Sequence, residues 1–265
     1  MRLIVQVWRQ AGPDAVGAFV EYPMDGLSGG MSILELLDRL NEDLIAAGQD
    51  PIAYESDCRE SICGMCGVTV NGRPQGPAPH LTTCMQRLRQ FGDGSTLRLE
   101  PLRAGAFPVV RDLVVDRSAL DRLLAAGANV AIDAGQAPDA DAVPDTHTTV
   151  ETALDYAACI GCGACVAACP NGSAYLFLGA KLTHLASLNL ASLQKHQRAV
   201  AMTTVAEDEF GPCSLYEECV DVCPANIPRE ALTAPGHERL AAFFAHETVR
   251  SRVPDRQAYE ELDLT

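Results

Sequence analysis

Eleven cysteines in three groups constrain this chain of 265 residues more than any other feature. A protein of this size does not need so many cysteines for packing. The opening segment Met1–Arg9 is too short and too interrupted for a signal peptide and predicts a strand instead, so disulfides are not expected, and the odd count agrees. We therefore predict that the cysteines bind metal.

The first group has the spacing C-x4-C-x2-C, followed by a more distant fourth cysteine. Three thiolates on one loop and a fourth on another segment can surround a two-iron cluster, and this is the leading spacing of plant-type ferredoxins. Gly64 and Gly67 between the ligands would let the backbone turn tightly and direct N–H groups at sulfur. Four thiolates also suit Zn²⁺, although structural zinc favours paired C-x2-C knuckles. The predicted ligands are Cys58, Cys63, Cys66 and Cys84.

The second group is the run C-x2-C-x2-C-x3-C-P of bacterial ferredoxins, which extends from Cys159 to Pro170. Its first three thiolates hold one four-iron cluster, whereas the fourth points at a neighbouring cluster. By this crossing rule the last cysteine of the third group should complete the 4Fe-4S cluster. Its predicted ligands are Cys159, Cys162, Cys165 and Cys223.

The third group resembles the same run, but Tyr216 occupies the second cysteine position. Three thiolates do not hold a fourth iron unless a phenolate helps, and tyrosine is a rare ligand, so we expect a 3Fe-4S cluster. The alternative is that the missing cysteine has no functional consequence. The predicted ligands are Cys169, Cys213 and Cys219, and with them all eleven cysteines are used.

The pattern of the remaining residues predicts two domains with different secondary structure. Strands are expected at Leu3–Val7, Ala18–Tyr22, Val68–Val70 and Leu97–Leu99, and the Asn71-Gly72 pair predicts a tight hairpin turn. A capping box of Ser32 and Glu35 opens a helix, whose expected apolar face is Leu34, Leu37, Leu40, Leu44 and Ile45. We predict a small mixed sheet with a helix across it.

After about Gly105 the sequence becomes helical. A short helix should begin at Asp116 or Ser118 and end at Gly127, and the segment Asn129–Thr149 should be a surface loop. A last helix is expected over His237–Arg252. The predicted domains are 1–104 and 105–250, followed by a C-terminal tail over 251–265.

Composition limits the function further. The net charge of −15 argues against nucleic-acid binding as the main activity. The most apolar later stretch, Tyr175–Leu193, contains Lys181 and His184 and does not predict a membrane span. If the protein acts at a membrane, we expect another chain to anchor it.

Over nearly its whole length, from Leu3 to about Phe244, the chain resembles the iron–sulfur subunit of succinate dehydrogenase and fumarate reductase. This resemblance implies an α+β fold, in which a β-grasp plant-type ferredoxin domain precedes an α-helical bacterial-ferredoxin-like domain. It implies that electrons pass between FAD in a flavoprotein subunit and a quinone through 2Fe-2S, 4Fe-4S and 3Fe-4S clusters in that order. The subunit would do no substrate chemistry itself. It would be peripheral, held by an integral-membrane anchor at the cytoplasmic face of a bacterial membrane.

The quinone side departs from the better-known members of this family. They usually have aromatic residues, including a Trp, after the Cys-Pro, and a His after the first cysteine of the last run. The corresponding residues here favour menaquinone as the partner. The quinone-side residues are expected to be Pro170, Asn171, Ser173, Ser214 and Tyr216. Arg59, beside Cys58, either tunes the two-iron site or pairs with the flavoprotein, or it is a plain surface charge.

Two other functions remain open. One is a soluble multi-cluster ferredoxin without a dedicated partner, which would have little use for a graded series of three clusters. The other is the iron–sulfur subunit of a different flavin-linked oxidoreductase. Such subunits often carry two complete ferredoxin runs, whereas this chain has one complete run.

Overall fold

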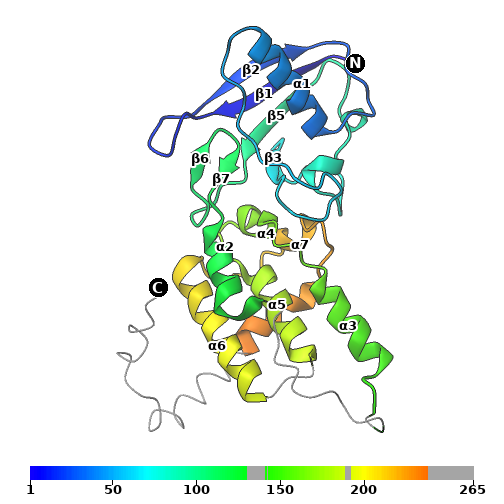
Figure 1. The fold of residues 1–265 in the computed structure, drawn as a ribbon, viewed down its shortest axis with the longest axis vertical. Helices are drawn as coiled ribbons and strands as arrows, with labels where there is room; N and C mark the ends of the chain where they lie inside the picture. Colours follow the sequence, from blue (N-terminus) through cyan, green and yellow to red (C-terminus); the bar gives the residue numbers. More distant parts are fainter. Residues whose placement is uncertain (130–140, 142, 189–191, 238–265) are drawn as a thin grey trace.

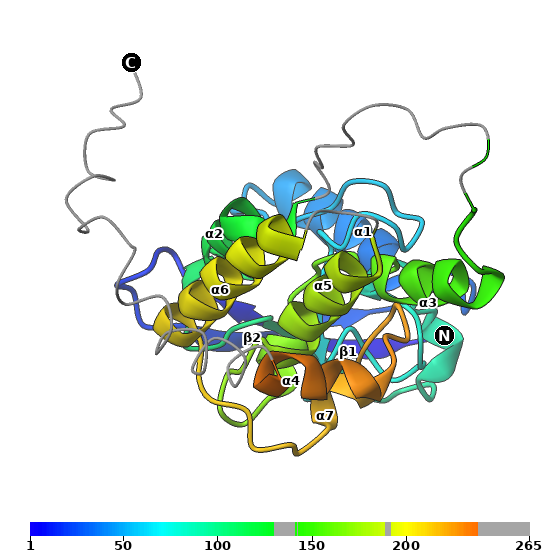
Figure 2. The same cartoon turned by 90° about the horizontal axis from the view of Figure 1, so that it is seen from below.

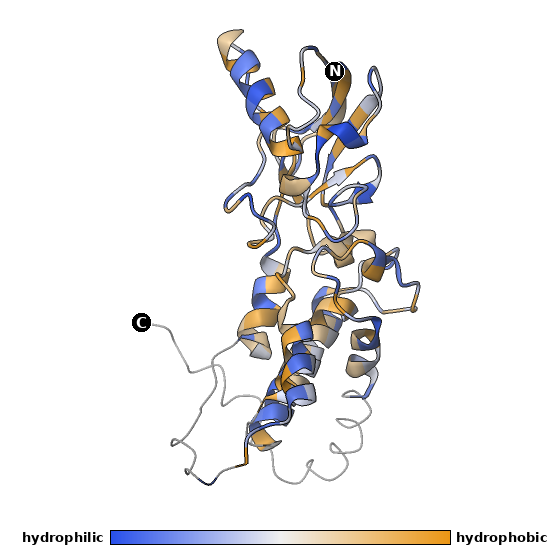
Figure 3. Cartoon of the chain, turned by 90° about the vertical axis from the view of Figure 1, so that its right-hand side faces the viewer, coloured by the Kyte–Doolittle hydropathy of each residue, from blue (hydrophilic) through white to orange (hydrophobic). Residues whose placement is uncertain are grey.

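The computed structural model describes residues 1–129, 141, 143–188 and 192–237. Within these ranges the molecule is elongated, with a β-sheet at one end and a group of helices at the other (Figure 1). The helices of the second part carry both hydrophilic and hydrophobic residues (Figure 3). A sheet-containing first half and a helical second half confirm the predicted mixture of the two structure types.

The first half is built on a five-stranded mixed sheet in the order β2-β1-β5-β3-β4. Strand β1 pairs antiparallel with β2 and parallel with the central strand β5, and every second side chain of β1 (Leu3, Val5 and Val7) is fully buried. This alternation confirms that one face of the sheet forms the core. The strands are β1 (Leu3–Arg9), β2 (Ala18–Met24), β3 (Val68–Val70), β4 (Arg73–Pro74) and β5 (Thr96–Pro101).

The helix α1 (Ile33–Ala46) packs its apolar residues into the core that the sheet provides. The predicted capping box is present: Glu35 N donates to Ser32 Oγ at 3.2 Å, and Ser32 N donates to Glu35 Oε2 at 2.6 Å. Ile45 is 62% exposed, so its place on the buried face was predicted wrongly. The helix ends one residue later, and Leu44 supplies the last buried contact.

The predicted hairpin turn is also confirmed. Strands β3 and β4 pair antiparallel, and Asn71 and Gly72 between them have φ angles of 49° and 80°. Two consecutive left-handed residues define the tight turn that an Asn-Gly pair favours. Beyond β4 the chain returns through two short 3-10 turns, η1 (Thr83–Met85) and η2 (Leu88–Gln90), to the last strand of the sheet.

A small hairpin of β6 (Val109–Arg111) and β7 (Val114–Val115) joins the two halves. At its tip Asp112 is buried and accepts hydrogen bonds from Gln10 N at 2.8 Å and Ala53 N at 2.9 Å. Its ion pair with Arg9 has an N–O distance of 3.1 Å. These contacts fasten the hairpin to the sheet domain.

The second half consists of helices that pack side by side around a second core. Helix α5 lies beside α3 and α6, as the view from below shows (Figure 2). The short helices α4 and α7 contact each other, and α4 also contacts β4 of the first half. The elements are α2 (Ser118–Leu123), η3 (Leu124–Ala128), α3 (His147–Ala157), α4 (Ala164–Ala168), α5 (Tyr175–Ser187), α6 (Ser192–Glu209), α7 (Glu218–Asp221) and η4 (Arg229–Thr233).

Some boundaries differ from the sequence predictions. Helix α2 begins at Ser118, one of the two predicted starts, whereas the expected loop Asn129–Thr149 ends early because α3 begins at His147. The rest of that loop is described only at 129, 141 and 143–146. Except for His237, the helix expected over His237–Arg252 and the tail over 251–265 lie outside the described residues. Across the described ranges no helix has the length and apolar content that a bilayer crossing requires.

Candidate iron–sulfur sites

The first three cysteines lie on the loop between α1 and β3, and Cys84 lies on η1. Residues with positive φ lie between the cysteines of this loop, at Arg59 (56°), Ser61 (63°) and Gly64 (74°). This backbone turns N–H groups inward, as in anion-binding nests. The backbone N atoms of Glu60 and Cys63 both donate to Cys58 Sγ at 3.3 Å, and these hydrogen bonds lower the Cys58 pKa. The loop therefore favours a thiolate at Cys58.

Cys66 and Cys84 are buried next to each other. A hydrogen bond with the Cys66 thiol lowers the pKa of Cys84 to about 5, and Thr82, whose Oγ1 lies 3.0 Å from Cys84 Sγ, lowers it further. A thiolate at Cys84 is thus stabilised on the segment opposite the loop. The four predicted ligands of the first site come from two segments that face each other, as a two-iron site requires.

Arg59 forms an ion pair with Asp38 of α1. This interaction, together with a hydrogen bond to Tyr54, lowers the pKa of Asp38. The guanidinium thereby fastens the cysteine loop to the helix, a role that was not among those weighed for Arg59 from the sequence.

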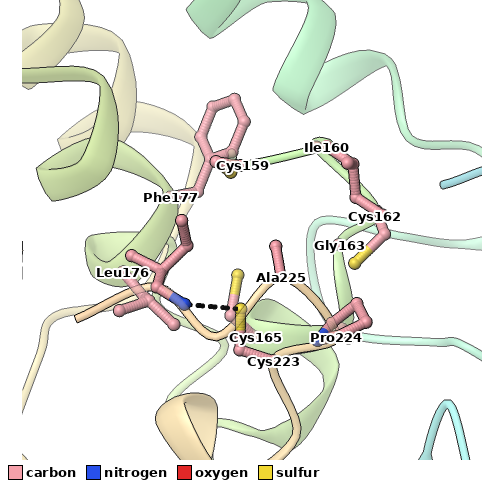
Figure 4. Close-up of a pocket in the computed structure, with 13 residues that line it drawn as sticks. Cys159, Ile160, Cys162, Gly163, Cys165, Leu176, Phe177, Cys223, Pro224 and Ala225 are labelled. Carbon is pink, nitrogen blue, oxygen red and sulfur yellow. Dashed lines mark hydrogen bonds between the residues drawn. The ribbon is translucent and has the colours of Figure 1, made fainter. Parts of the chain in front are cut away.

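The second predicted set, Cys159, Cys162, Cys165 and Cys223, lines one cavity in the helical half (Figure 4). Cys159 precedes α4, Cys165 lies on it, and Cys223 follows α7. Burial is the largest influence on these thiols and raises the pKa of Cys162 to about 12. Thiolates in this environment need a cationic partner, which the irons of a cluster would provide. The donor set, soft sulfur without carboxylates, fits an iron–sulfur cluster.

The third predicted set, Cys169, Cys213 and Cys219, lines a second cavity. Burial raises the pKa of Cys219 to about 12, and the nearby Cys169 and Cys213 add to this effect. Leu215 N donates to Cys213 Sγ at 3.4 Å. The Tyr216 side chain also borders this cavity but is 58% exposed.

Helices α4 and α7 connect the two cavities. Each carries a cysteine of one set and leads to a cysteine of the other: Cys165 and Cys169 along α4, Cys219 and Cys223 along α7. The pKa of Cys165 is raised first by burial and also by Cys219 of the other set. Among the described residues, no three His, Cys, Asp or Glu side chains converge on a position for a single metal ion.

The five residues predicted on the quinone side fall at two neighbouring cavities. Ser173, Ser214 and Tyr216 line the cavity of the third set. Pro170 and Asn171 line an adjacent one, which shares Cys169 with it. The two groups are joined because Asn171 Nδ2 donates to Ser214 Oγ at 2.8 Å.

Arg117 was missed by the sequence analysis. Its guanidinium, only 13% exposed, donates to Gly64 O at 2.9 Å and Cys162 O at 3.3 Å, and it pairs with Glu55 Oε2 at 3.1 Å. It therefore binds the loop of the first site to the loop of the second. No local motif marks this arginine, because its partners are 45 to 62 residues away in the sequence.

The two cysteine loops lie in close contact at Gly64. Its φ is +74°, and a Cβ atom there would lie 2.9 Å from Ile160 O and 3.1 Å from Cys162 Cα. A side chain would force the two loops apart. From the sequence this glycine was expected to serve the geometry of its own loop alone, whereas in the structure it also allows contact between the two halves.

Comparison with known proteins agrees with this arrangement. Residues 4–122 match the family described as "2Fe-2S iron-sulfur cluster binding domain", and residues 155–227 match "4Fe-4S dicluster domain". The succinate dehydrogenase iron-sulfur subunit of Bacillus subtilis is 31% identical over 184 residues, which cover 67% of this chain and 68% of that protein. The fumarate reductase iron-sulfur subunit of Escherichia coli is 28% identical over 237 residues, which cover 89% and 90% of the two chains.

A solved structure supports the fold. A chain of the "Mycobacterium smegmatis Sdh1 complex in the apo form" superposes with a TM-score of 0.65 at 22% identity, covering 96% of this chain and 98% of that one. The family matches, the relatives and the cysteine geometry lead to the same conclusion. The chain belongs to the family of iron–sulfur subunits of succinate dehydrogenases and fumarate reductases, and it is an electron-transfer subunit with a two-iron domain followed by a four-iron dicluster domain.

Proposed function

We propose that this subunit conducts single electrons between FAD in a flavoprotein subunit and a quinone at a membrane. The observation that carries the proposal is that the second and third predicted cysteine sets line two separate cavities, while the first set lies on the loop between α1 and β3 and on η1. The first site touches the second through Gly64 and Arg117, and the second shares α4 and α7 with the third. Succinate oxidation or fumarate reduction would take place on the flavoprotein.

We propose one cluster for each of the three cysteine sets. Cys58, Cys63, Cys66 and Cys84 would hold a 2Fe-2S cluster; Cys159, Cys162, Cys165 and Cys223 a 4Fe-4S cluster; Cys169, Cys213 and Cys219 a 3Fe-4S cluster. The last assignment is supported by the composition of the third cavity, whose lining contains three cysteines and the mostly exposed Tyr216. When bound, the three clusters would supply one-electron redox chemistry.

We further propose a β-grasp plant-type ferredoxin domain over 1–104, a helical ferredoxin domain over 105–250 and a tail over 251–265. The change from one main hydrophobic core to the other, between Leu102 and Leu113, lies around the first boundary. One core joins α1 to the sheet, while the other begins at Leu102 and continues through the helices of the second half.

Partner subunits would cover the exposed apolar residues beside the outer sites. Ile62 is 63% exposed beside the first site, which would face the flavoprotein. Leu215 is 60% exposed beside the third site, which would face an integral-membrane anchor and the quinone. We place the subunit at the cytoplasmic face of a bacterial membrane. Menaquinone is the proposed quinone because the residues that follow Cys169 and Cys213 lack the aromatic and His residues of the better-known members.

An EPR-monitored redox titration of the purified complex tests the proposal. Three distinct signals are expected, from a reduced two-iron, a reduced four-iron and an oxidised three-iron cluster, with about nine irons and ten sulfides per subunit. Extraction of the complex should yield menaquinone. An assay dominated by zinc, or a complex without a flavoprotein, would contradict the assignment.

A further inference from the structure

The Gln75 side chain lies between the first and second sites and has an unused hydrogen-bond donor. Gln75 follows β4, is 1% exposed, and has a φ of +68°. Its Nε2 is one of two buried side-chain polar atoms without a hydrogen-bond partner in the described part of the chain. Because a buried unpaired donor is costly, such an atom calls for an explanation.

The orientation of the Gln75 amide is fixed by Thr83. Thr83 N lies 2.9 Å from Gln75 Oε1, and Thr83 Oγ1 lies 3.0 Å from the same atom. A backbone N–H can only donate, so the atom that faces it must be the amide oxygen. Nε2 consequently points away from Thr83 N, and an amide flip would break the hydrogen bond that this backbone N–H donates.

Nε2 points toward the loop of the second site. A Cβ atom built on Gly67 would lie 3.1 Å from Gln75 Nε2 and 3.6 Å from Cys162 O, which places both groups around the same point. Gly67 has no side chain to stand between them, so the space between the Gln75 amide and the Cys162 loop stays open on this side. The donor is therefore directed at the side of the second cavity that Cys162 forms.

We propose that Gln75 Nε2 donates a hydrogen bond to the sulfur of the centre held by Cys159, Cys162, Cys165 and Cys223, and thereby raises its reduction potential. This inference rests on the proposed function. Adding one electron increases the negative charge on the cluster and its thiolates, so an N–H donor stabilises the reduced form more than the oxidised form. Gln75 would be a positioning and tuning residue rather than a ligand.

The contacts of Gln75 also connect the second site to the first. Thr83 is adjacent to Cys84, a proposed ligand of the first site. Gln75 is held to the backbone beside one site through its hydrogen bonds with Thr83, and its Nε2 points toward the loop of the next site. The amide would therefore both raise the reduction potential of the second centre and help to hold the second site in place next to the first.

The test compares variants in the purified complex. Gln75→Met removes the donor without adding charge, and Gln75→Glu keeps the oxygen acceptor for Thr83 while it replaces the donor with a second oxygen. In EPR titrations we expect the ratio of reduced to oxidised four-iron cluster at a fixed potential to fall about tenfold in Gln75→Met, which is a shift of about 59 mV for one electron. Gln75→Glu should shift it at least as far, and the two-iron potential should change much less.

Gln86→Met is the matched control. Gln86 is equally buried, but its amide is fully engaged: Nε2 donates to Ala78 O at 3.0 Å, and Oε1 accepts from Ala78 N at 3.0 Å. Losing this amide should leave the four-iron potential unchanged. A role for Gln75 in general packing alone would instead produce the same result for both glutamines.

The outcomes separate this inference from the proposed function. If the wild-type complex shows no four-iron signal, the proposed function fails and the inference with it. If that signal is present but its potential is the same in wild type and Gln75→Met, only the inference is overturned. If the variants lose the cluster, the test uses wild-type complex with ¹⁵N-labelled glutamine side-chain amides. Pulsed EPR should then show ¹⁵N coupling to the reduced four-iron cluster. The absence of this coupling overturns the inference.

Discussion

At the scale of single residues, our proposal makes Tyr216 the residue that sets the iron content of the third site. It stands where a ferredoxin run has its second cysteine, between Leu215 and Glu217, whose φ angles are 57° and 68°. We predict that Tyr216→Cys admits a fourth iron, because the backbone already lines the cavity at this position. The EPR signal of the oxidised three-iron cluster should disappear, and a signal of lower potential should replace it.

Tyr216→Phe is the control for this change, since it removes the phenol without adding a thiol. It should retain the three-iron signal. If that signal also persists in Tyr216→Cys, the alignment of the last cysteine run is wrong.

Individual residues of the candidate sites differ in how well the sequence predicted them. The cysteine sets of the second and third sites were predicted from spacing, because ferredoxin runs place their ligands within a helical turn. Arg117 and Gln75 were not predicted, because their contacts join segments that only the folded chain brings together. Their residue types carry no local signature, and no periodicity marks them.

At the scale of elements, local signals succeeded where a helix or turn is stabilised by its own sequence. The capping box and the Asn-Gly turn are of this kind. Helices α4 and α7 are only five and four residues long, so no periodic pattern could reveal them. Such short helices are held by the packing of their neighbours rather than by propensity.

Ser32→Ala tests the stability of α1. Loss of an N-cap hydroxyl costs about 1 kcal/mol, which should increase amide hydrogen exchange in the first turn of α1 about fivefold. The matched control is Ser28→Ala, because Ser28 Oγ accepts from Gly30 N at 3.2 Å outside the helix. Unchanged exchange at Glu35 in Ser32→Ala would contradict the role of the cap.

At the scale of the whole molecule, the two halves must hold their cysteine sites at a constant separation. The hairpin β6–β7 ties the linker to the sheet through Asp112, and Arg73 Nη2 donates to Asp221 O at 2.5 Å across the junction. Arg117 contacts both cysteine loops, with its charge balanced by Glu55. Because electron transfer depends on the distance between centres, we regard this junction as part of the electron path.

Arg117→Met should loosen both loops without removing any ligand. The loss of hydrogen bonds from a largely buried guanidinium should destabilise the junction by about 2 kcal/mol, because Glu55 keeps partial access to water. Hydrogen exchange of the loop amides at 58–66 and 159–163 should then increase at least tenfold. Arg122→Met provides the comparison, since Arg122 pairs with Glu209 at an exposed position and should leave both loops unchanged. Faster exchange in only one of the two loops would show that Arg117 supports that loop alone and does not join the sites.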